Sequence, residues 1–438
     1  MDMPSQWESA ARLVRRTGFG ATGAQVDAAV QMGTAHYVSS MLAADPGADR
    51  GAKATPMPRF PAINYGDKGA ARDKTAKKAL NKQRGEQLKA MTAWWLRRMI
   101  AVEQPFGEKL TFCWHNHFAT SAKKVKDPGL MLGQNTKLRT LGRGDFHTLA
   151  YGMLTDAAML RWLDGQQNTS KAPNENLARE FMELFTLGHG DAYTEADVRE
   201  GARALTGWRA NLDGTTAFRA NLHDNGSKTV LGVTGNLDAA SFCNAALAVP
   251  GAARYLATRM WGQLVSDTPP SAAVLDRLVS AYAAKRDVSA MLAAMFTAPE
   301  FDAAHGSIVV TPVEWLVGVV RALRVPVKTD GDAIQLIRVL MGLGQIPFYP
   351  PSVAGWPSGQ AWLSTAAVDL RLQTATALAS AGDLSALDGS APSRVDAVAH
   401  LLGIGSWSAR SSAVLRAAAS DPKRLVALAV NTPEYLTN

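Results

Sequence analysis

Apolar residues recur every three to four positions along most of the chain, which is the spacing of amphipathic helices. The first such segment, WESAARLVRRTGFG, is expected to end at Gly18 or Gly20, and a second helix is expected over 24–42. The clearest helix is NENLAREFMELFTLG, with Asn174 as its N-cap and Gly188 as its stop. The pattern therefore predicts a mainly α protein, built as a large bundle-like helical domain.

Two stretches interrupt this pattern. Residues 208–232 contain Asp213-Gly214 and Asn225-Gly226, pairs that favour tight turns, so a short β-hairpin or extended insertion is expected there. Residues 345–364, QIPFYPPSVAGWPSGQAWLS, hold four prolines and predict a rigid Pro/Trp-rich loop.

Other segments fix the organisation around these interruptions. Residues 46–70 are rich in Pro and Gly and predict a loop, and a basic helical segment is expected over 66–99. Capping boxes at Thr194–Asp197 and Thr311–Glu314 mark two further helix starts. The length of 438 residues by itself allows either two or three domains or one large helical domain.

Charge and composition add limits on partners and compartment. The net charge is +8, and the run from Lys68 to Arg98 holds ten Lys or Arg against two acids. Such a run is typical of a solvated helix face, and the alternative is contact with an anionic polymer. Two cysteines exclude a disulfide framework, and no stretch is apolar enough for a signal core or a membrane span. A cytoplasmic protein is expected from the chain as given, or an exported one whose signal has been removed.

The stretch FCWHNHFATS (112–121) is the first candidate for chemistry, because His115 and His117 are two of only eight histidines. Residues two apart on a helix do not share a face, so both rings reach one ion only if the helix ends near Trp114. The alternative is that these are buried histidines, each bonded to a carboxylate.

Glu180 and Glu183 are the second candidate. They are three residues apart on a predicted helix, so their carboxylates converge and require a proton, a cation or an arginine between them. Helical carboxylates combined with histidines are the usual ligands of di-iron and di-manganese centres. The alternative is an ion pair with Arg179, Arg199 or Arg203.

The third candidate is LHDNGSKTVLG, where His223, Asp224 and Lys228 stand on an irregular segment. Loops that carry such residues are common catalytic positions. The alternative is a turn closed by a hydrogen bond to the Asp224 side chain. His189 follows the Glu180/Glu183 helix and is expected to cap its C-terminus.

Five segments occur in a fixed order and together resemble a known family: ARLVRRTGFGAT, FCWHNHFATS, NENLAREFMELFTLGHGDAYTEADVREGARALTGW, LHDNGSKTVLG and PPSVAGWPSGQAW. They resemble the bacterial family catalogued as domain of unknown function 1800, along nearly the whole chain. The resemblance implies one family-length helical domain over 1–438. Many members carry an export signal, which this sequence does not display, and Cys113 stands where an aliphatic residue or phenylalanine is usual.

The resemblance also implies which polar residues belong to the family motifs. Those in the histidine, glutamate and loop motifs are Trp114, His115, Asn116, His117, Phe118, Asn174, Glu175, Asn176, Arg179, Glu180, Glu183, Thr194, Glu195, Asp197, Trp208, His223, Asp224, Lys228 and Thr229. Those in the Pro/Trp loop are Gly355, Trp356, Pro357 and Trp362. Because the polar residues concentrate between 108 and 228, we expect them to form one central site.

Two functions follow as hypotheses. The first is an enzyme for a hydrolytic or oxidative reaction. Its metal ligands for iron, manganese or zinc, or its acid/base groups, would be His115, His117, Glu180 and Glu183. Its catalytic groups would be His223, Asp224 and Lys228. No G-x-S-x-G, H-E-x-x-H or phosphate-loop motif supports the common hydrolase or nucleotide-binding classes. The second is a non-catalytic scaffold or chaperone. The family implies its partner, an adjacent-gene protein of domain of unknown function 1501, which resembles alkaline phosphatases and sulfatases. The aromatic loop would then be the docking surface.

Overall fold

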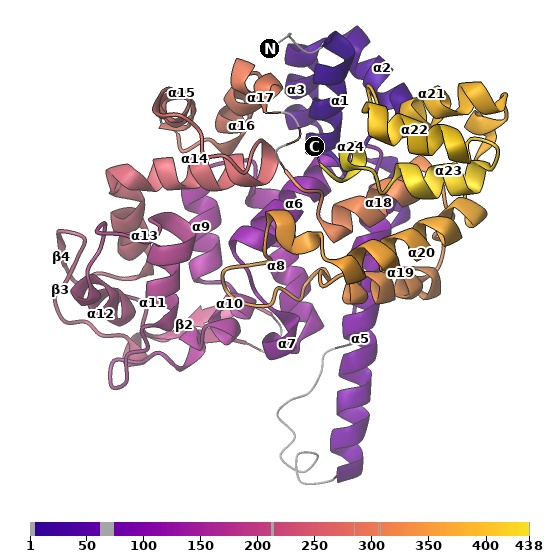
Figure 1. Cartoon of the computed structure of the whole chain (residues 1–438). Helices are drawn as coiled ribbons and strands as arrows, with labels where there is room; N and C mark the ends of the chain where they lie inside the picture. The colour runs from indigo at the N-terminus through magenta and orange to yellow at the C-terminus, as the bar shows by residue number, and fades with distance from the viewer. Residues whose placement is uncertain are drawn as a thin grey trace.

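The computed structural model describes residues 5–61, 74–211, 214–283, 285–304, 306 and 308–437. Helices make up most of it, and the strands form two small sheets, which confirms the mainly α prediction (Figure 1). Within these ranges, none of the helices combines the length and the apolar character that crossing a bilayer requires.

The first half of the chain is helical up to the two small sheets. Its helices are α1 (Gln6–Thr17), α2 (Gly23–Met32), α3 (Thr34–Ala43), α4 (Arg50–Ala54), α5 (Lys74–Ala101), α6 (Phe106–His117), α7 (Ala122–Val125), α8 (Pro128–Leu141), α9 (Phe146–Leu154), α10 (Ala157–Trp162), η1 (Gly165–Gln167), α11 (Asn176–Glu180), η2 (Phe181–Thr186) and α12 (Glu195–Ala204).

The second half is helical again after the sheets. Its helices are η3 (Ala220–Leu222), α13 (Ala239–Ala248), α14 (Pro250–Leu264), α15 (Ala272–Ala283), α16 (Val288–Phe296), α17 (Pro299–Ala303), α18 (Pro312–Ala322), α19 (Asp330–Gly342), η4 (Gly359–Trp362), α20 (Thr365–Ala381), η5 (Ser385–Leu387), α21 (Ala391–Leu401), α22 (Ala409–Ala418), α23 (Pro422–Ala429) and α24 (Pro433–Leu436).

The extended insertion consists of two antiparallel pairs. Strand β1 (Trp208–Ala210) pairs with β2 (Thr216–Phe218), and β3 (Lys228–Val230) pairs with β4 (Val233–Gly235). The prediction of a short hairpin insertion is confirmed, although the second pair extends past 232 and Asp213 lies outside the described residues.

Local sequence signals set several helix ends as expected. The capping boxes at Thr194 and Thr311 are both formed, each with its side chain bonded to the amide three residues on. The single helix predicted over 24–42 is wrong, because Gly33 adopts φ 78° and separates α2 from α3. Such a positive φ is inexpensive only for glycine, so Gly33 ends one helix and starts the next.

The basic helical segment is the long helix α5, whose first half projects away from the body (Figure 1). Lys74, Lys77, Lys78 and Lys82 are exposed there, as expected of a solvated helix face. The prediction of a loop over 46–70 is wrong at α4, which is a short helix. Residues 62–73, which include the end of that stretch and the start of the basic segment over 66–99, lie outside the described part of the chain.

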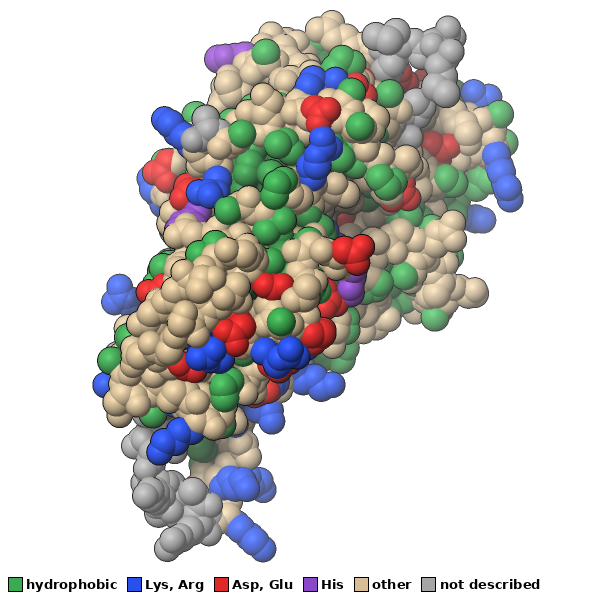
Figure 2. Space-filling model, turned by 90° about the vertical axis from the view of Figure 1, so that its left-hand side faces the viewer, with side chains coloured by type: hydrophobic (Ala, Val, Ile, Leu, Met, Phe, Trp, Pro, Cys, Tyr) green, Lys and Arg blue, Asp and Glu red, His purple; other side chains and the backbone are tan. Residues whose placement is uncertain are grey.

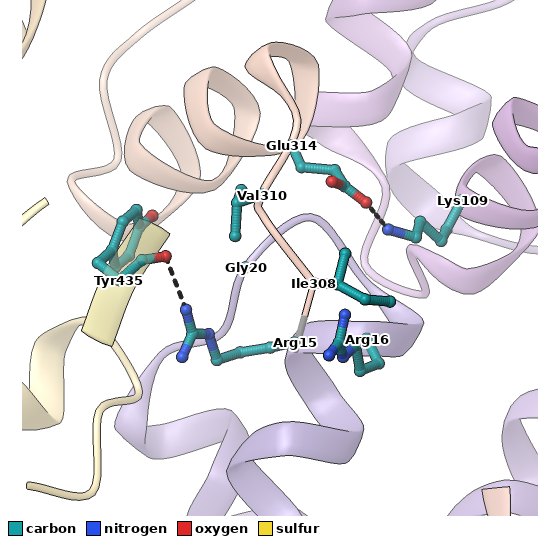
Figure 3. A pocket seen from close by; sticks show the side chains of 8 residues that line it. All are labelled: Arg15, Arg16, Gly20, Lys109, Ile308, Val310, Glu314 and Tyr435. Atoms are coloured by element: carbon teal, nitrogen blue, oxygen red, sulfur yellow. Dashed lines mark hydrogen bonds and ion pairs between the residues drawn. The ribbon is translucent and has the colours of Figure 1, made fainter. Parts of the chain in front are cut away.

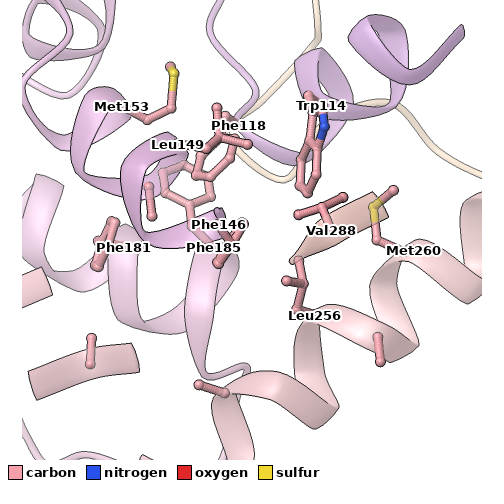
Figure 4. Packing of buried hydrophobic residues seen from close by; sticks show 14 of the residues in the cluster. Trp114, Phe118, Phe146, Leu149, Met153, Phe181, Phe185, Leu256, Met260 and Val288 are labelled. Carbon is pink, nitrogen blue, oxygen red and sulfur yellow. The ribbon is translucent and has the colours of Figure 1, made fainter. Parts of the chain in front are cut away.

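Two large apolar clusters form the interior. One lies between α6, α9, η2 and α14, where Trp114 and Phe146 stack at 5.8 Å (Figure 4). The other gathers α5, α18 and the Pro/Trp-rich loop, whose Phe348, Trp356 and Trp362 are all buried. Of the four aromatic rings expected to dock a partner, these three pack in the core and Tyr349 is half-buried, so docking through this loop stays a prediction that the packing does not favour. The number of domains within 1–438 stays a prediction.

Candidate functional site

The first histidine motif lies at the end of α6, which continues to His117. The condition for a shared ion, a helix ending near Trp114, is therefore not met, and the two rings occupy different surroundings. His115 Nε2 accepts a hydrogen bond of 3.1 Å from the backbone N–H of Phe348, while the ring packs at 5.4 Å from both Trp95 and Trp356.

Asn116 fixes the same loop from the neighbouring position. Its Oδ1 accepts a hydrogen bond of 2.8 Å from the backbone N–H of Trp356, and its Nδ2 donates to Gln263 at 3.3 Å. The loop approaches closely here, because a Cβ on Gly355 would lie 2.4 Å from Asn116 Oδ1. His115 and Asn116 thus hold the Pro/Trp-rich loop against α6.

His117 makes a different contact. Its Nε2 lies 3.0 Å from the carbonyl oxygen of Phe185, and because a carbonyl only accepts, Nε2 carries the proton. Burial lowers the pKa of both His115 and His117 to about 3, so both rings are neutral at physiological pH. Within the described ranges, neither histidine bonds to a carboxylate, contrary to the alternative considered above.

The Phe185 carbonyl belongs to η2, a π-helical turn that continues α11. The last carbonyls of a helix have no partner within it, and here two side chains from elsewhere supply the donors. His117 donates to Phe185, and the Tyr255 hydroxyl donates to the Leu184 carbonyl at 2.8 Å. Because π-turns are uncommon and often occur at functional sites, this turn makes the residues it carries of interest.

The two carboxylates of this segment have unequal surroundings. Glu183 accepts hydrogen bonds from the Tyr193 hydroxyl at 3.1 Å and pairs with His189 Nδ1 at 3.0 Å. Glu180 is half-buried, and no group in the described ranges donates a hydrogen bond to it. Desolvation, followed by the charge of Glu183, raises the pKa of the Glu180 carboxyl. Desolvation and the Glu183 charge also raise the pKa of Tyr193 to about 12, which keeps its phenol protonated.

Two of the three arginines proposed as alternative partners form ion pairs with other carboxylates, although the charge of Arg179 still acts on Glu180. Arg179 donates to Glu195 at 2.6 Å and to Glu175 at 3.1 Å. Arg203 binds Glu200 and Asp224. His189 reaches the pair through a 3.0 Å contact between its Nδ1 and Glu183, and its capping of the helix stays a prediction.

The third cluster is built as a structural turn. Asp224 accepts from Arg203 Nε at 2.7 Å and from the Gly226 N–H at 2.8 Å, which is the predicted alternative of a turn closed by the Asp224 side chain. His223 Nδ1 contacts Thr206, and the buried Lys228 ammonium donates to the Gly226 carbonyl and to Asn236. These groups stabilise the insertion against α12.

The predicted central site is therefore divided among three places. His115 lies at the Pro/Trp-rich loop, Glu180 ends α11 and Glu183 lies on the π-turn that His117 contacts, and His223 lies at the insertion. Throughout the described ranges, no three His, Cys, Asp or Glu side chains come together in a way that could hold a metal ion. Iron, manganese or zinc binding by the predicted four ligands stays a prediction that this arrangement does not favour.

Two tyrosines join the site that the sequence did not single out. Tyr193 lies within the quoted stretch GDAYTEAD, ten residues after Glu183, so its place in the motif was a usable signal. Tyr255 reaches Leu184 from α14, and only the fold reveals it. Figure 2, which faces α12–α15, shows acidic side chains interleaved with basic ones on this side of the molecule.

The chain matches one known protein family over nearly its whole length. The sequence profile of a family described as "Protein of unknown function (DUF1800)" matches residues 12–437. No curated protein and no solved structure matches the chain. The resemblance inferred from the five ordered segments is thereby confirmed.

Proposed function

The chain belongs to the DUF1800 family, and we propose that it is an enzyme that uses Glu180 and Glu183 for proton transfer in a hydrolytic reaction. The observation that carries the proposal is the contrast between the two carboxylates. Glu183 receives two donors, whereas Glu180 receives none and has a raised pKa. Carboxyl groups held in different environments are the usual way in which one site supplies both an acid and a base.

The surroundings support distinct roles for the two groups. A carboxyl whose pKa is raised towards neutrality transfers protons efficiently near pH 7, which suits Glu180 as the general acid or base. Glu183, bonded to Tyr193 and His189, is suited to orient a substrate or a water molecule. His117 is a positioning residue, because its bond to the Phe185 carbonyl fixes the turn that carries Glu183.

The test compares hydrolysis of chromogenic esters, glycosides and phosphomonoesters by the wild type and by Glu180→Gln. For the substrate class that is turned over, we expect kcat to fall by roughly 100-fold or more, which is the usual contribution of a general acid or base. Glu86→Gln on the exposed face of α5 is the matched control and should leave kcat unchanged.

The pKa of Glu180 gives a second measurement that needs no substrate. Carboxyl-carbon NMR should report a raised pKa for Glu180, and that pKa should fall in Glu183→Gln, because the neighbouring charge is removed. An unshifted Glu180 pKa, or equal turnover by wild type and Glu180→Gln, would contradict the proposal.

A scaffold is the second candidate, and a surface observation favours it. Met341 on α19, Leu363 just after η4, and Val368 and Leu372 on α20 are exposed apolar side chains, and α19 packs against α20. If these side chains form one apolar patch, that patch is typical of a protein contact. The partner proposed from the family resemblance is a protein of domain of unknown function 1501. Co-purification of the two proteins, lost in Met341→Asp with Val368→Asp, would support this candidate.

A further inference from the structure

An open groove lies between the first helix of the chain and the C-terminal helices α21 and α22 (Figure 1). It has a volume of about 430 Å³, and its polar and aromatic lining consists of Trp7, Asp396, His400, Ser406, Trp407 and Ser412. Trp7 belongs to α1, whereas the other five belong to α21, to α22 and to the segment that joins them. Residues from both ends of the chain therefore line one groove.

Hydrogen bonds hold these two ends of the chain together. Arg15, in the last turn of α1, donates to the backbone carbonyls of Glu434 at 3.1 Å and Tyr435 at 2.8 Å, and Figure 3 shows the second of these bonds. The Glu434 carboxylate in turn accepts from the Ser408 N–H and the Ser411 hydroxyl at the start of α22. These contacts fix the walls of the groove before a ligand enters, which reduces the entropic cost of binding.

Two tryptophans line the groove, and the indole N–H of each is already bonded. Trp7 Nε1 donates to Asp27 Oδ1 at 2.8 Å, and Trp407 Nε1 donates to the Val395 carbonyl at 3.1 Å. Both rings are half-buried and pack on apolar clusters beneath them. The two rings therefore offer a ligand carbon surface and π-electrons rather than hydrogen-bond donors.

The charge of the lining is negative. Asp396 is exposed, and no cation in the described ranges pairs with it. His400 Nε2 is bonded to Asp27 at 2.9 Å, so this pair adds no net positive charge whether or not the imidazole is protonated. Arg394 and Arg410 stand on the same two helices, but among the described residues neither these nor any other arginine or lysine lines the groove.

Glu8 adds a second carboxylate beside the groove. A Cβ on Gly405 would lie 2.5 Å from Glu8 Cγ and 3.1 Å from Glu8 Oε1, so the Glu8 side chain covers this glycine. Glu8 accepts hydrogen bonds from Ser5 in the capping box of α1. Its charge reaches Arg12, which also pairs with Asp302. Arg12 is thus shared between two carboxylates and offsets only part of the negative charge.

The rest of the lining is apolar. Val395, Ala399 and Ile404 are buried and complete it. A complementary ligand therefore carries a positive charge for Asp396 and apolar substituents for the aliphatic and aromatic surface. An anion fits poorly beside Asp396 and Glu8, and a sugar finds few free donors here because both indole N–H groups are used.

We propose that this groove binds an organic cation of the quaternary ammonium type, with the rings of Trp7 and Trp407 and the carboxylate of Asp396 as its ligands. Tryptophan attracts cations more strongly than the other aromatic side chains, and aromatic rings are the usual ligands of quaternary ammonium groups. Free choline and the phosphocholine headgroup of a lipid present the same trimethylammonium chemistry. The groove contains none of the residues of the glutamate site, so either proposal stands if the other fails.

The experiment is a ligand-observed NMR titration of the full-length protein with choline chloride at pH 7, at an ionic strength kept constant with sodium chloride. A parallel titration uses 3,3-dimethyl-1-butanol, in which a carbon atom replaces the ammonium nitrogen and the shape is kept without the charge. We expect saturable binding of choline by the wild type. The Kd of the neutral analogue should be higher by roughly three- to thirtyfold, which is the usual range of a cation–π contact.

Two variants separate the contribution of charge from that of shape. Asp396→Asn should raise the Kd of choline by about two- to fivefold, as expected for an exposed charge pair, and leave the Kd of the neutral analogue unchanged. Trp407→Leu should raise the Kd of choline more than that of the neutral analogue, because leucine keeps apolar surface and lacks the π-electrons. Asp191→Asn, at an exposed position between η2 and α12, is the matched control and should bind choline as the wild type does.

The same titration distinguishes the two sources of the cation. Tighter binding of phosphocholine than of choline identifies a headgroup, and equal or weaker binding identifies the free cation. Absence of saturable choline binding by the wild type, or an equal Kd for choline and its neutral analogue, would overturn the proposal, and so would saturable binding of glucose in place of choline. If Trp407→Leu does not fold, the wild-type comparison and the exposed Asp396→Asn decide, and an unchanged choline Kd in Asp396→Asn counts against the proposal.

Discussion

The backbone N–H of Phe348 donates to the Nε2 of His115 across 3.1 Å, although the two residues are 233 positions apart. Phe348 has φ 71°, a left-handed conformation that is unfavourable for a residue with a bulky side chain. Its carbonyl also accepts a hydrogen bond of 2.8 Å from Ala122. The strained residue is thus held at both backbone groups, and His115 stabilises the Pro/Trp-rich loop rather than a ligand.

We expect His115→Phe to destabilise the protein by about 1–3 kcal/mol, because the buried Phe348 N–H would lose its acceptor. The free energy of unfolding in urea measures this change. His36→Phe, at an exposed position of α3, makes the same chemical change outside the core and should shift stability by less than about 0.5 kcal/mol. Equal effects of the two substitutions would contradict a structural role for His115.

Acid should weaken the fold in a defined pH window. The pKa values of His115 and His117 are lowered by burial from 6.5 to about 3, so between these values the unfolded chain binds protons that the folded chain does not. The stability that the two neutral rings provide is fully present above pH 6.5 and is lost as pH falls towards 3. Each histidine contributes a slope approaching about 1.4 kcal/mol per pH unit in this window.

Urea unfolding at several pH values between 5 and 7 measures that slope. The wild-type free energy of unfolding should decrease as pH is lowered, and His115→Phe should show a smaller decrease, because one titrating group has been removed. His36→Phe should keep the wild-type slope, since its ring is exposed in both states. An identical slope in all three proteins would show that the buried histidines are not the source.

Patterns that depend on neighbouring residues were predicted well from the sequence. The helical period, the capping boxes at Thr194 and Thr311, and the insertion after Trp208 all follow from local backbone and side-chain preferences. The turn closed by the Asp224 side chain, which was the predicted alternative to a catalytic role for this residue, is also formed. Gly33 is the local signal that was overlooked, because its left-handed conformation was not expected within an apolar period.

The grouping of the site residues could not be predicted, because it depends on contacts between distant segments. A histidine spacing of two indicates which helix faces are used, but not that His115 meets Phe348 or that His117 meets Phe185. The ion pair between Lys109 on α6 and Glu314 on α18 is a stronger example, since the two residues are 205 positions apart. No local pattern contains that information.

The separation of the histidines from the glutamates leads to a prediction about metal content. If iron, manganese or zinc is bound, we expect the carboxylates of Glu180 and Glu183 to be its ligands, because the described residues place no metal-holding group of three His, Cys, Asp or Glu side chains around the free Nδ1 of His117. We therefore expect His117→Ala to retain the wild-type metal content per folded molecule, and Glu180→Gln to reduce whatever content the wild type has. Elemental analysis of untagged protein measures both. A stoichiometric metal that disappears in folded His117→Ala would restore the predicted four-ligand site.

Substitutions at two glycines of the Pro/Trp-rich loop measure the cost of backbone strain with and without the cost of close packing. Both adopt positive φ, 88° at Gly355 and 64° at Gly359. A Cβ on Gly355 would lie 2.4 Å from Asn116 Oδ1 and 2.6 Å from the Asn116 carbonyl oxygen, whereas a Cβ on Gly359 meets nothing within 4 Å. Gly359→Ala should cost about 1–2 kcal/mol, because only the left-handed conformation is penalised.

Gly355→Ala should cost clearly more than Gly359→Ala, because the added methyl must also push the loop away from Asn116. That displacement would break the 2.8 Å bond from the Trp356 N–H to Asn116 Oδ1 and loosen the packing of the Trp356 ring on His115. Unfolding free energies, together with tryptophan fluorescence of the folded state, measure the two effects. Equal costs for the two substitutions would mean that the loop yields freely at Gly355, and that the contact between α6 and the loop contributes little to the fold.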